Sequence, residues 1–223
     1  MTWVGENLGL IGTLSLEHLR QSLVPVLLSV LVSLPLGWVA WRWRVLRGPI
    51  VATTGLMYTI PSLALLMIVP GIVGIAPFDE SNLVISLTVY ATALLVRSVV
   101  DGLDSVSPDT RLAATALGYS TARRLRAVEL PLAGPVILAG LRVVAASTIA
   151  LATVGILVGV TNLGYLFTNG LERRIVPEVL TGVLTVVLIA ALIDLLLVLA
   201  GRRLMPWAHL DRRTTATEAR NGA

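Results

Sequence analysis

The sequence predicts an all-α membrane protein with about five transmembrane helices, because its composition, its long apolar runs and the placement of its charges all indicate this class. Of the 223 residues, 56% are hydrophobic and only 13% are charged. A soluble domain carries roughly 25% charged residues. The charges are absent from several long stretches and concentrated between them, as in proteins that cross a membrane several times.

Five apolar segments are long enough to cross a membrane, since a helix rises about 1.5 Å per residue and about 20 residues are needed. They run from Gln21 to Ala40, Pro49 to Val69, Leu83 to Leu103, Leu132 to Val158 and Pro177 to Ala200. We therefore expect an N-terminal segment over residues 1–20, one membrane domain over 21–204 and a tail over 205–223. The tail is polar from Asp211 on and lacks apolar periodicity, so we expect it to be disordered.

The arginines predict the orientation of the chain. Three groups follow the first, third and fifth spans: Arg42, Arg44 and Arg47; Arg111, Arg123, Arg124 and Arg126; and Arg202, Arg203, Arg212, Arg213 and Arg220. The alternate loops carry only Arg20, Arg173 and Arg174. Because positively charged loops stay in the cytoplasm, we expect the N-terminus outside and the C-terminus inside. Membrane orientation and lipid contact explain these arginines better than nucleic-acid binding does.

Missing residue types exclude several functions. The chain has no Cys and no Lys, which excludes thiol catalysis, thiolate metal sites and the phosphate-binding Lys of a Walker A loop. Gly118-Tyr119-Ser120-Thr121 superficially resembles the Gly-x-Ser of intramembrane proteases, whose Ser needs a His on a second embedded helix. Ser120 lies in a basic loop, and His18 and His209 lie outside the spans. We therefore expect neither catalytic residues nor a metal site, and any ATP must bind another chain.

The loop over residues 107–131 has the local chemistry of two short helices. Ser107 can cap the first helix, and Gly118 can end it in a left-handed conformation. An apolar stripe on this helix is formed by Leu112, Ala113, Ala116 and Leu117. Ser120 can cap the second helix, and Pro131 then begins the next span. Such a knob can fill an apolar groove of a partner protein, or it can lie on anionic lipid; physics alone leaves both open.

The same loop resembles the signature of the permease subunits of binding-protein-dependent ABC importers. The matching residues are Leu112-Ala113-Ala114, Gly118 and Val128-Glu129-Leu130-Pro131. Further matches are Tyr58-Thr-Ile-Pro-Ser-Leu-Ala-Leu65, Glu129-Leu-Pro-Leu-Ala133 and Pro135-Val-Ile-Leu-Ala-Gly-Leu-Arg142, which look like the branch that imports glycine betaine, choline, carnitine or proline. The resemblance covers roughly residues 20 to 200. Leu112 stands where the family usually has Glu, so this position has no charge for the electrostatic contact of that Glu.

The resemblance implies a type I importer permease in the bacterial plasma (inner) membrane. Two permease subunits, identical or paralogous, would line a path, and an external binding protein would deliver the solute. Two ATPase subunits, which hold ATP and Mg, would receive the coupling loop 107–131. The coupling residues would be Leu112, Ala113, Ala114, Ala116, Leu117 and Gly118. Alternatives are a permease for another solute such as an amino acid, or a passive channel or scaffold subunit.

Charged residues inside the spans are further candidates, since such residues are costly in a membrane and usually face protein or water. Arg142 and Asp194 lie at similar depth in the fourth and fifth spans. We expect them to pair, within the chain or between two permeases, either as part of a gate or as a structural pair. Arg97, Asp101 and Asp104 have helical spacing and predict local ion pairs near the end of the third span.

Aromatic residues, a proline and two glycines complete the candidate pathway. Pro61 should kink the second span, which either shapes a pathway or serves packing. Tyr58 and Tyr90 could contact a quaternary amine, although packing is the simpler role. Gly159 and Gly164 either allow close helix packing or, by the resemblance, belong to a flexible external region.

Overall fold

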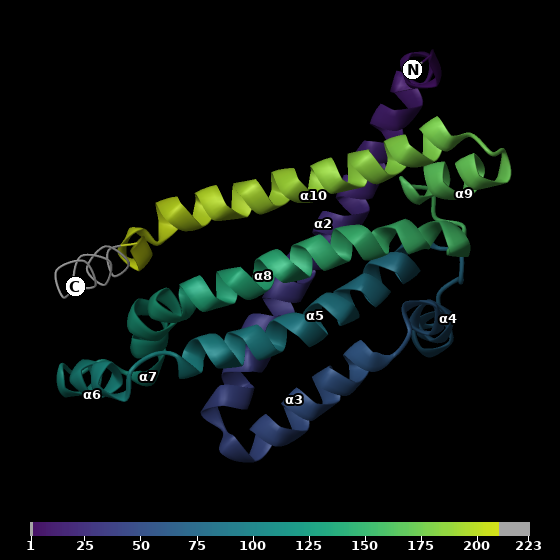
Figure 1. Ribbon diagram of the computed structural model, residues 1–223. Helices are drawn as coiled ribbons and strands as arrows, with labels where there is room; N and C mark the ends of the chain where they lie inside the picture. The colour runs from purple at the N-terminus through teal and green to yellow at the C-terminus, as the bar shows by residue number, and fades with distance from the viewer. Residues whose placement is uncertain (1, 210–223) are drawn as a thin grey trace, which may run out of the picture.

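The computed structural model describes residues 2–209 and is built of helices, without strands, over that range (Figure 1). In order these are α1 (Thr2–Glu6), α2 (Leu8–Arg42), α3 (Arg44–Thr59), α4 (Ser62–Val73), α5 (Glu80–Asp104), α6 (Pro108–Ala116), α7 (Thr121–Arg124), a π-turn (Leu125–Glu129), α8 (Leu130–Ala152), a 3-10 turn (Thr153–Val158), α9 (Gly164–Glu172), α10 (Val176–Leu204) and a 3-10 turn (Pro206–His209). The expected disorder of the tail from Asp211 on lies outside the described residues.

The helices confirm the prediction of about five spans. Four helical runs are long and apolar enough to cross a membrane, and α3 with α4 makes a fifth if that bent pair is one span. The first predicted span is part of a longer helix, since α2 begins at Leu8 rather than near Gln21. Its 35 residues extend about 52 Å at 1.5 Å per residue, which exceeds the thickness of the hydrocarbon. Accordingly, α2 lies diagonally across the other long helices (Figure 1).

The second span is broken rather than kinked, which corrects the expectation of one bent helix. The axes of α3 and α4 form an angle of 112°. Pro61 supplies no N–H, and its ring disfavours the helical conformation for Ile60, which is extended at φ −65° and ψ 128°. The Tyr90 hydroxyl on α5 donates a hydrogen bond to the Ile60 carbonyl group at this break. A neighbouring helix therefore satisfies a backbone group that the break exposes.

The core is the layer in which α5 packs between α2 and α8. Buried aliphatic side chains along α5, such as Val96, Val99 and Leu103, fill it. Small residues bring the helices close: an added Cβ would lie 2.6 Å from Val99 Cγ1 at Gly37 and 2.8 Å from Ile137 Cγ1 at Gly102. This packing makes α2, α5 and α8 a rigid unit.

The second helix expected in the loop is not separate, and the helix of the fourth span does not begin at Pro131 as predicted. α7, the π-turn and α8 form one continuous helical run from Thr121 to Val158. The π-turn gives the physical reason. In this wider turn the Leu130 N–H donates to the Leu125 carbonyl group, five residues back, so the helix continues although Pro131 has no N–H to donate. Of the two short helices expected in the loop, only α6 is separate from the spans.

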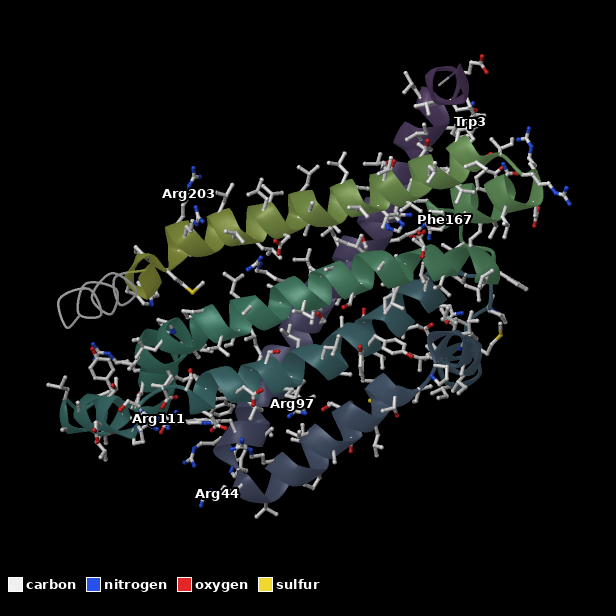
Figure 2. All side chains as sticks on the ribbon, viewed as in Figure 1. Trp3, Arg44, Arg97, Arg111, Phe167 and Arg203 are labelled. Atoms are coloured by element: carbon white, nitrogen blue, oxygen red, sulfur yellow. The ribbon has the colours of Figure 1, made fainter. Side chains whose placement is uncertain are left out.

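The two ends of the bundle differ in charge. Figure 2 shows Arg44, Arg111 and Arg203 toward the end that carries α6, whereas Trp3 and Phe167 lie at the opposite end. At this opposite end Asp79 caps α5: the Ser81 backbone N–H donates to its carboxylate at 2.8 Å and holds the pKa of that carboxyl below its usual value. Arg44, Arg111 and Arg203, one described member of each of the three groups of arginines that follow alternate spans, therefore lie at one end.

Candidate functional site

The predicted coupling helix is present as α6 and is capped as its sequence indicates. The Ser107 hydroxyl accepts a hydrogen bond from the Asp109 N–H at 3.2 Å, and Pro108 occupies the first turn. Gly118 is left-handed at φ +80°, which ends the helix as expected. Local chemistry alone therefore sets the length of this helix.

One side of α6 is an apolar surface that the described part of the chain leaves open. Leu112 and Leu117 are 68% and 77% exposed, and Ala113 and Ala116 are exposed beside them. We call these four residues the coupling face. Ala114, which the sequence placed in the same set, is buried at 5% exposure. It packs inward and supports the helix from behind.

The opposite side of α6 faces a buried carboxylate whose importance the sequence reasoning missed. Glu129 is 1% exposed, and its Oε1 accepts a hydrogen bond from Arg124 Nε at 2.8 Å. Arg111 Nε lies 4.0 Å from the same oxygen, and the Arg111 guanidinium lies 4.8 Å from the centre of the Trp41 ring. One feature of the sequence could have indicated Glu129: it stands directly before Leu-Pro in the most basic loop of the chain.

The structure brings Arg142 and Asp194 together within one chain. Arg142 Nε donates to Asp194 Oδ1 at 2.6 Å, and Arg142 Nη2 donates to Oδ2 at 2.7 Å, the bidentate geometry that orients both groups. The two side chains are still 41% and 39% exposed. Because a charged pair inside a span is costly against lipid, this side of α8 and α10 should face protein or water.

The aromatic candidates gather at the break in the second span. Tyr58 and Tyr90 meet edge to face, with ring centroids 6.1 Å apart. Tyr90 is 6% exposed and binds the carbonyl group that precedes Pro61, whereas Tyr58 is 48% exposed. Of this pair, only Tyr58 therefore presents a large exposed surface.

The predicted ion pairs at the end of the third span form in part. Arg97 Nε lies 4.0 Å from Asp101 Oδ2, four residues along α5. Asp104 instead pairs with Arg47 of α3 at 2.5 Å, a contact between two spans that helical spacing cannot indicate. This pair ties the start of α3 to the end of α5.

Gly159 and Gly164 lie in a compact turn, and the flexible external region that the resemblance implied stays a prediction. Gly159 is left-handed at φ +79° and ends the 3-10 turn. A side chain at Gly164 would collide with the Thr153 carbonyl group. Asn162, which is fully buried, accepts the Gly164 N–H at 2.8 Å and donates to Gln21 Oε1 at 3.0 Å. Close packing is thus the role that the geometry supports, and sequence reasoning missed Asn162 and Gln21.

Comparison with known proteins identifies the chain. The family model described as the inner membrane component of binding-protein-dependent transport systems matches residues 19–209. The chain belongs to this family. It is therefore the permease subunit of a binding-protein-dependent ABC importer, a multi-pass protein of the inner membrane.

Several characterised permeases are similar over most of their length. The choline transport permease OpuBB of Bacillus subtilis is 32% identical over 85% of this chain and 86% of its own. The glycine betaine/carnitine/choline permease OpuCD of the same organism is 30% identical over 96% of both chains. The osmoprotectant import permease OsmW of Salmonella typhimurium is 30% identical over 86% of this chain and 90% of its own.

Among solved structures, the permease shares its fold with a chain of the MetNI methionine ABC transporter, captured in inward-facing conformations. The TM-score is 0.81, the identity 20%, and the match covers 89% of this chain and 98% of the other. This agreement confirms an all-α fold of the type I importer class.

The geometry of the permease argues against protease chemistry. The Ser120 hydroxyl accepts the Arg123 N–H at 3.4 Å and caps α7. His18 Nε2 instead lies 3.0 Å from the Ile149 carbonyl oxygen. At 1.5 Å per residue, Ile149 lies about 40 Å from α7 along the continuous helix, so His18 is far from Ser120. The family is the transmembrane component of its transporters, and the ATPase is a separate subunit.

Proposed function

We propose that this permease, with a second permease subunit, forms the transmembrane path through which a small osmoprotectant such as glycine betaine, choline, carnitine or proline is imported. The main support is its similarity, along nearly the whole chain, to permeases named for choline, carnitine, glycine betaine and osmoprotectant transport. An external binding protein would supply tight recognition, and the path would carry the solute onward.

The coupling face is where we place the ATPase. Leu112 and Leu117 are large apolar side chains held out from the bundle on a capped helix, and Ala113 and Ala116 between them allow a partner to approach closely. The leucine at position 112 makes this contact apolar where the family usually has a carboxylate. ATP and Mg would be held entirely by the ATPase, whose closure would draw the two coupling helices together.

The arginines at the end of the bundle that carries α6 support an orientation for the permease. Because α6 shares its end with described arginines of the three groups, among them Arg44, Arg111 and Arg203, we place that end in the cytoplasm and the turn around Gly159 and Gly164 outside. The Arg142–Asp194 pair then lies inside the membrane on a face that lipid should not cover. We propose that this face, with Tyr58, borders the path or the second permease, and that the pair contributes to the gate.

The experiment is reconstitution of the permease with its ATPase and binding protein in proteoliposomes, followed by uptake of radiolabelled solutes. We expect ATP-dependent uptake of at least one of glycine betaine, choline, carnitine and proline, and none of methionine. Uptake of methionine or another unrelated amino acid alone would overturn the solute class. Failure of the permease to copurify with the ATPase, or uptake without ATP, would favour a passive channel or scaffold subunit.

A further inference from the structure

We propose that Glu129 is a positioning residue that locks the coupling helix α6 to the transmembrane helix α8, so that force on the coupling face reaches the membrane. This inference rests on the proposed coupling function and adds the element that transmits it. Figure 2 shows Arg111, one partner of Glu129, near the junction of α6 with the bundle.

The burial of this carboxylate is the first observation. Glu129 is 1% exposed, and the Arg124 and Arg111 side chains that flank it are 21% and 22% exposed. Buried carboxylates are retained in proteins where they are paired. One oxygen, Oε1, is 2.8 Å from Arg124 Nε and 4.0 Å from Arg111 Nε. Within residues 2–209 that Arg111 nitrogen has no hydrogen-bond acceptor, and Glu129 is the carboxylate found within 4.0 Å of it.

The two arginines extend this contact to separate helices. Arg124 Nη1 donates to the Thr115 hydroxyl of α6 at 2.9 Å. Arg111, also on α6, donates through Nη2 to the Leu103 carbonyl group at the end of α5 and stacks on Trp41 at the end of α2. One buried carboxylate thus lies at the centre of a cluster that joins α2, α5, α6 and α8.

The π-turn places the carboxylate. Glu129 is the last residue of the turn Leu125–Glu129, which inserts one residue into an otherwise continuous helix. One residue corresponds to about 100° of rotation at 3.6 residues per turn. The insertion therefore changes which side of the run faces α6, and π-turns are frequent where a helix has a functional task.

The remaining contacts of α6 explain why this link matters. Its coupling face is open, so among the described residues α6 is held from its other side, where buried Ala114 lies between Arg111 and Thr115. In this poorly solvated setting an ion pair is stronger than at an exposed surface. Without the charge on Glu129, α6 would still form and dock on the ATPase, but it would turn relative to α8 instead of moving with it.

The test uses the full reconstituted transporter and measures solute imported per ATP hydrolysed. Glu129→Gln keeps the shape of the side chain and removes its charge. We expect ATP hydrolysis to continue while the ATP consumed per imported solute rises by about 5- to 150-fold, the range typical of coupling between two sites. Thr115→Val, which removes the Arg124 link to α6 and leaves Arg111 and the buried carboxylate in place, should raise the same ratio by a smaller factor. Arg126→Gln is the matched control, since Arg126 is exposed on the same turn and makes no ion pair among the described residues.

A second readout separates positioning from mere stability. The chain has no Cys, so spin labels at Asp109→Cys on α6 and Ala127→Cys in the π-turn report their separation directly. We expect one narrow distance distribution with Glu129 and a broad one with Gln at that position. An unchanged ratio together with an unchanged distribution would overturn the proposal. So would a parallel loss of ATPase activity, uptake and assembled complex in both Glu129→Gln and Thr115→Val. If the unaltered permease itself supports no ATP-driven uptake, the proposed function fails instead.

Discussion

Replacing Gly37 with alanine should destabilise the protein by about 2 kcal/mol, because it forces a methyl group into the crossing of α2 and α5. The new Cβ would lie 2.6 Å from Val99 Cγ1, 2.7 Å from Val99 Cβ and 3.2 Å from the Val96 carbonyl oxygen. Carbon atoms prefer separations of about 3.5–4.0 Å, so the overlap approaches 1 Å at two atoms. Val99 is fully buried, and a valine in a helix has one strongly preferred rotamer. The strain must therefore move one helix against the other.

A second substitution tests whether this loss of stability arises from the contact between positions 37 and 99. Val99→Ala alone should cost about 2 kcal/mol, since two methyl groups leave the core at roughly 0.8 kcal/mol each and a small cavity remains. In the double variant the alanine at position 37 fills that cavity. We therefore expect the double variant to lose about 2 kcal/mol less than the sum of the single losses.

The assay is the free energy of unfolding of the purified permease, measured by titration with sodium dodecyl sulfate in mixed micelles. All four proteins of the cycle, including the unaltered one, are compared under the same conditions. Strictly additive losses, or a Gly37→Ala protein as stable as the original, would refute the close crossing of α2 and α5.

Four further substitutions test the site. Asp194→Asn and Arg142→Gln should each lower the amount of assembled permease, because each leaves one charge unpaired in the membrane. The double variant should recover part of the loss in the same membrane-yield assay; purely additive losses would dismiss the pair. Gly164→Ala should cost about 1–3 kcal/mol in the micelle titration because its methyl group meets a backbone carbonyl group, whereas Gly12→Ala, with open space around it, should not destabilise. Tyr90→Phe should cost about 1–3 kcal/mol by leaving the carbonyl group at the break between α3 and α4 without its donor; an unchanged unfolding free energy would rule out that bond.

The sequence was sufficient for those features that local chemistry decides. Apolar runs gave the spans, and capping residues such as Ser107 and Gly118 gave the bounds of α6. The depth of Arg142 and Asp194 in consecutive spans was enough to pair them, because few polar partners exist inside a membrane. Each of these inferences depended on neighbours in the chain or on a depth that the helical rise supplies.

The features that the sequence did not supply depend on contacts between distant segments. A proline predicts a kink, but the 112° break also needs Tyr90 from α5 to satisfy the backbone at that point. Pro131 looked like the start of a helix because the preceding π-turn, which accommodates it, has no sequence signature. The sequence did not predict a role for Glu129, because that role depends on burial between two arginines, and burial is a property of the fold.

Photo-cross-linking inside living cells tests directly whether the coupling face contacts the ATPase. A photoreactive phenylalanine analogue at Leu117 is compared with the same group at Leu180, an exposed residue of α10, in cells that express the ATPase and binding protein. We expect a cross-link to the ATPase from position 117 and none from position 180. Labelling of a cysteine at position 117 by a membrane-impermeant reagent added outside intact cells, with no cross-link to the ATPase, would contradict it.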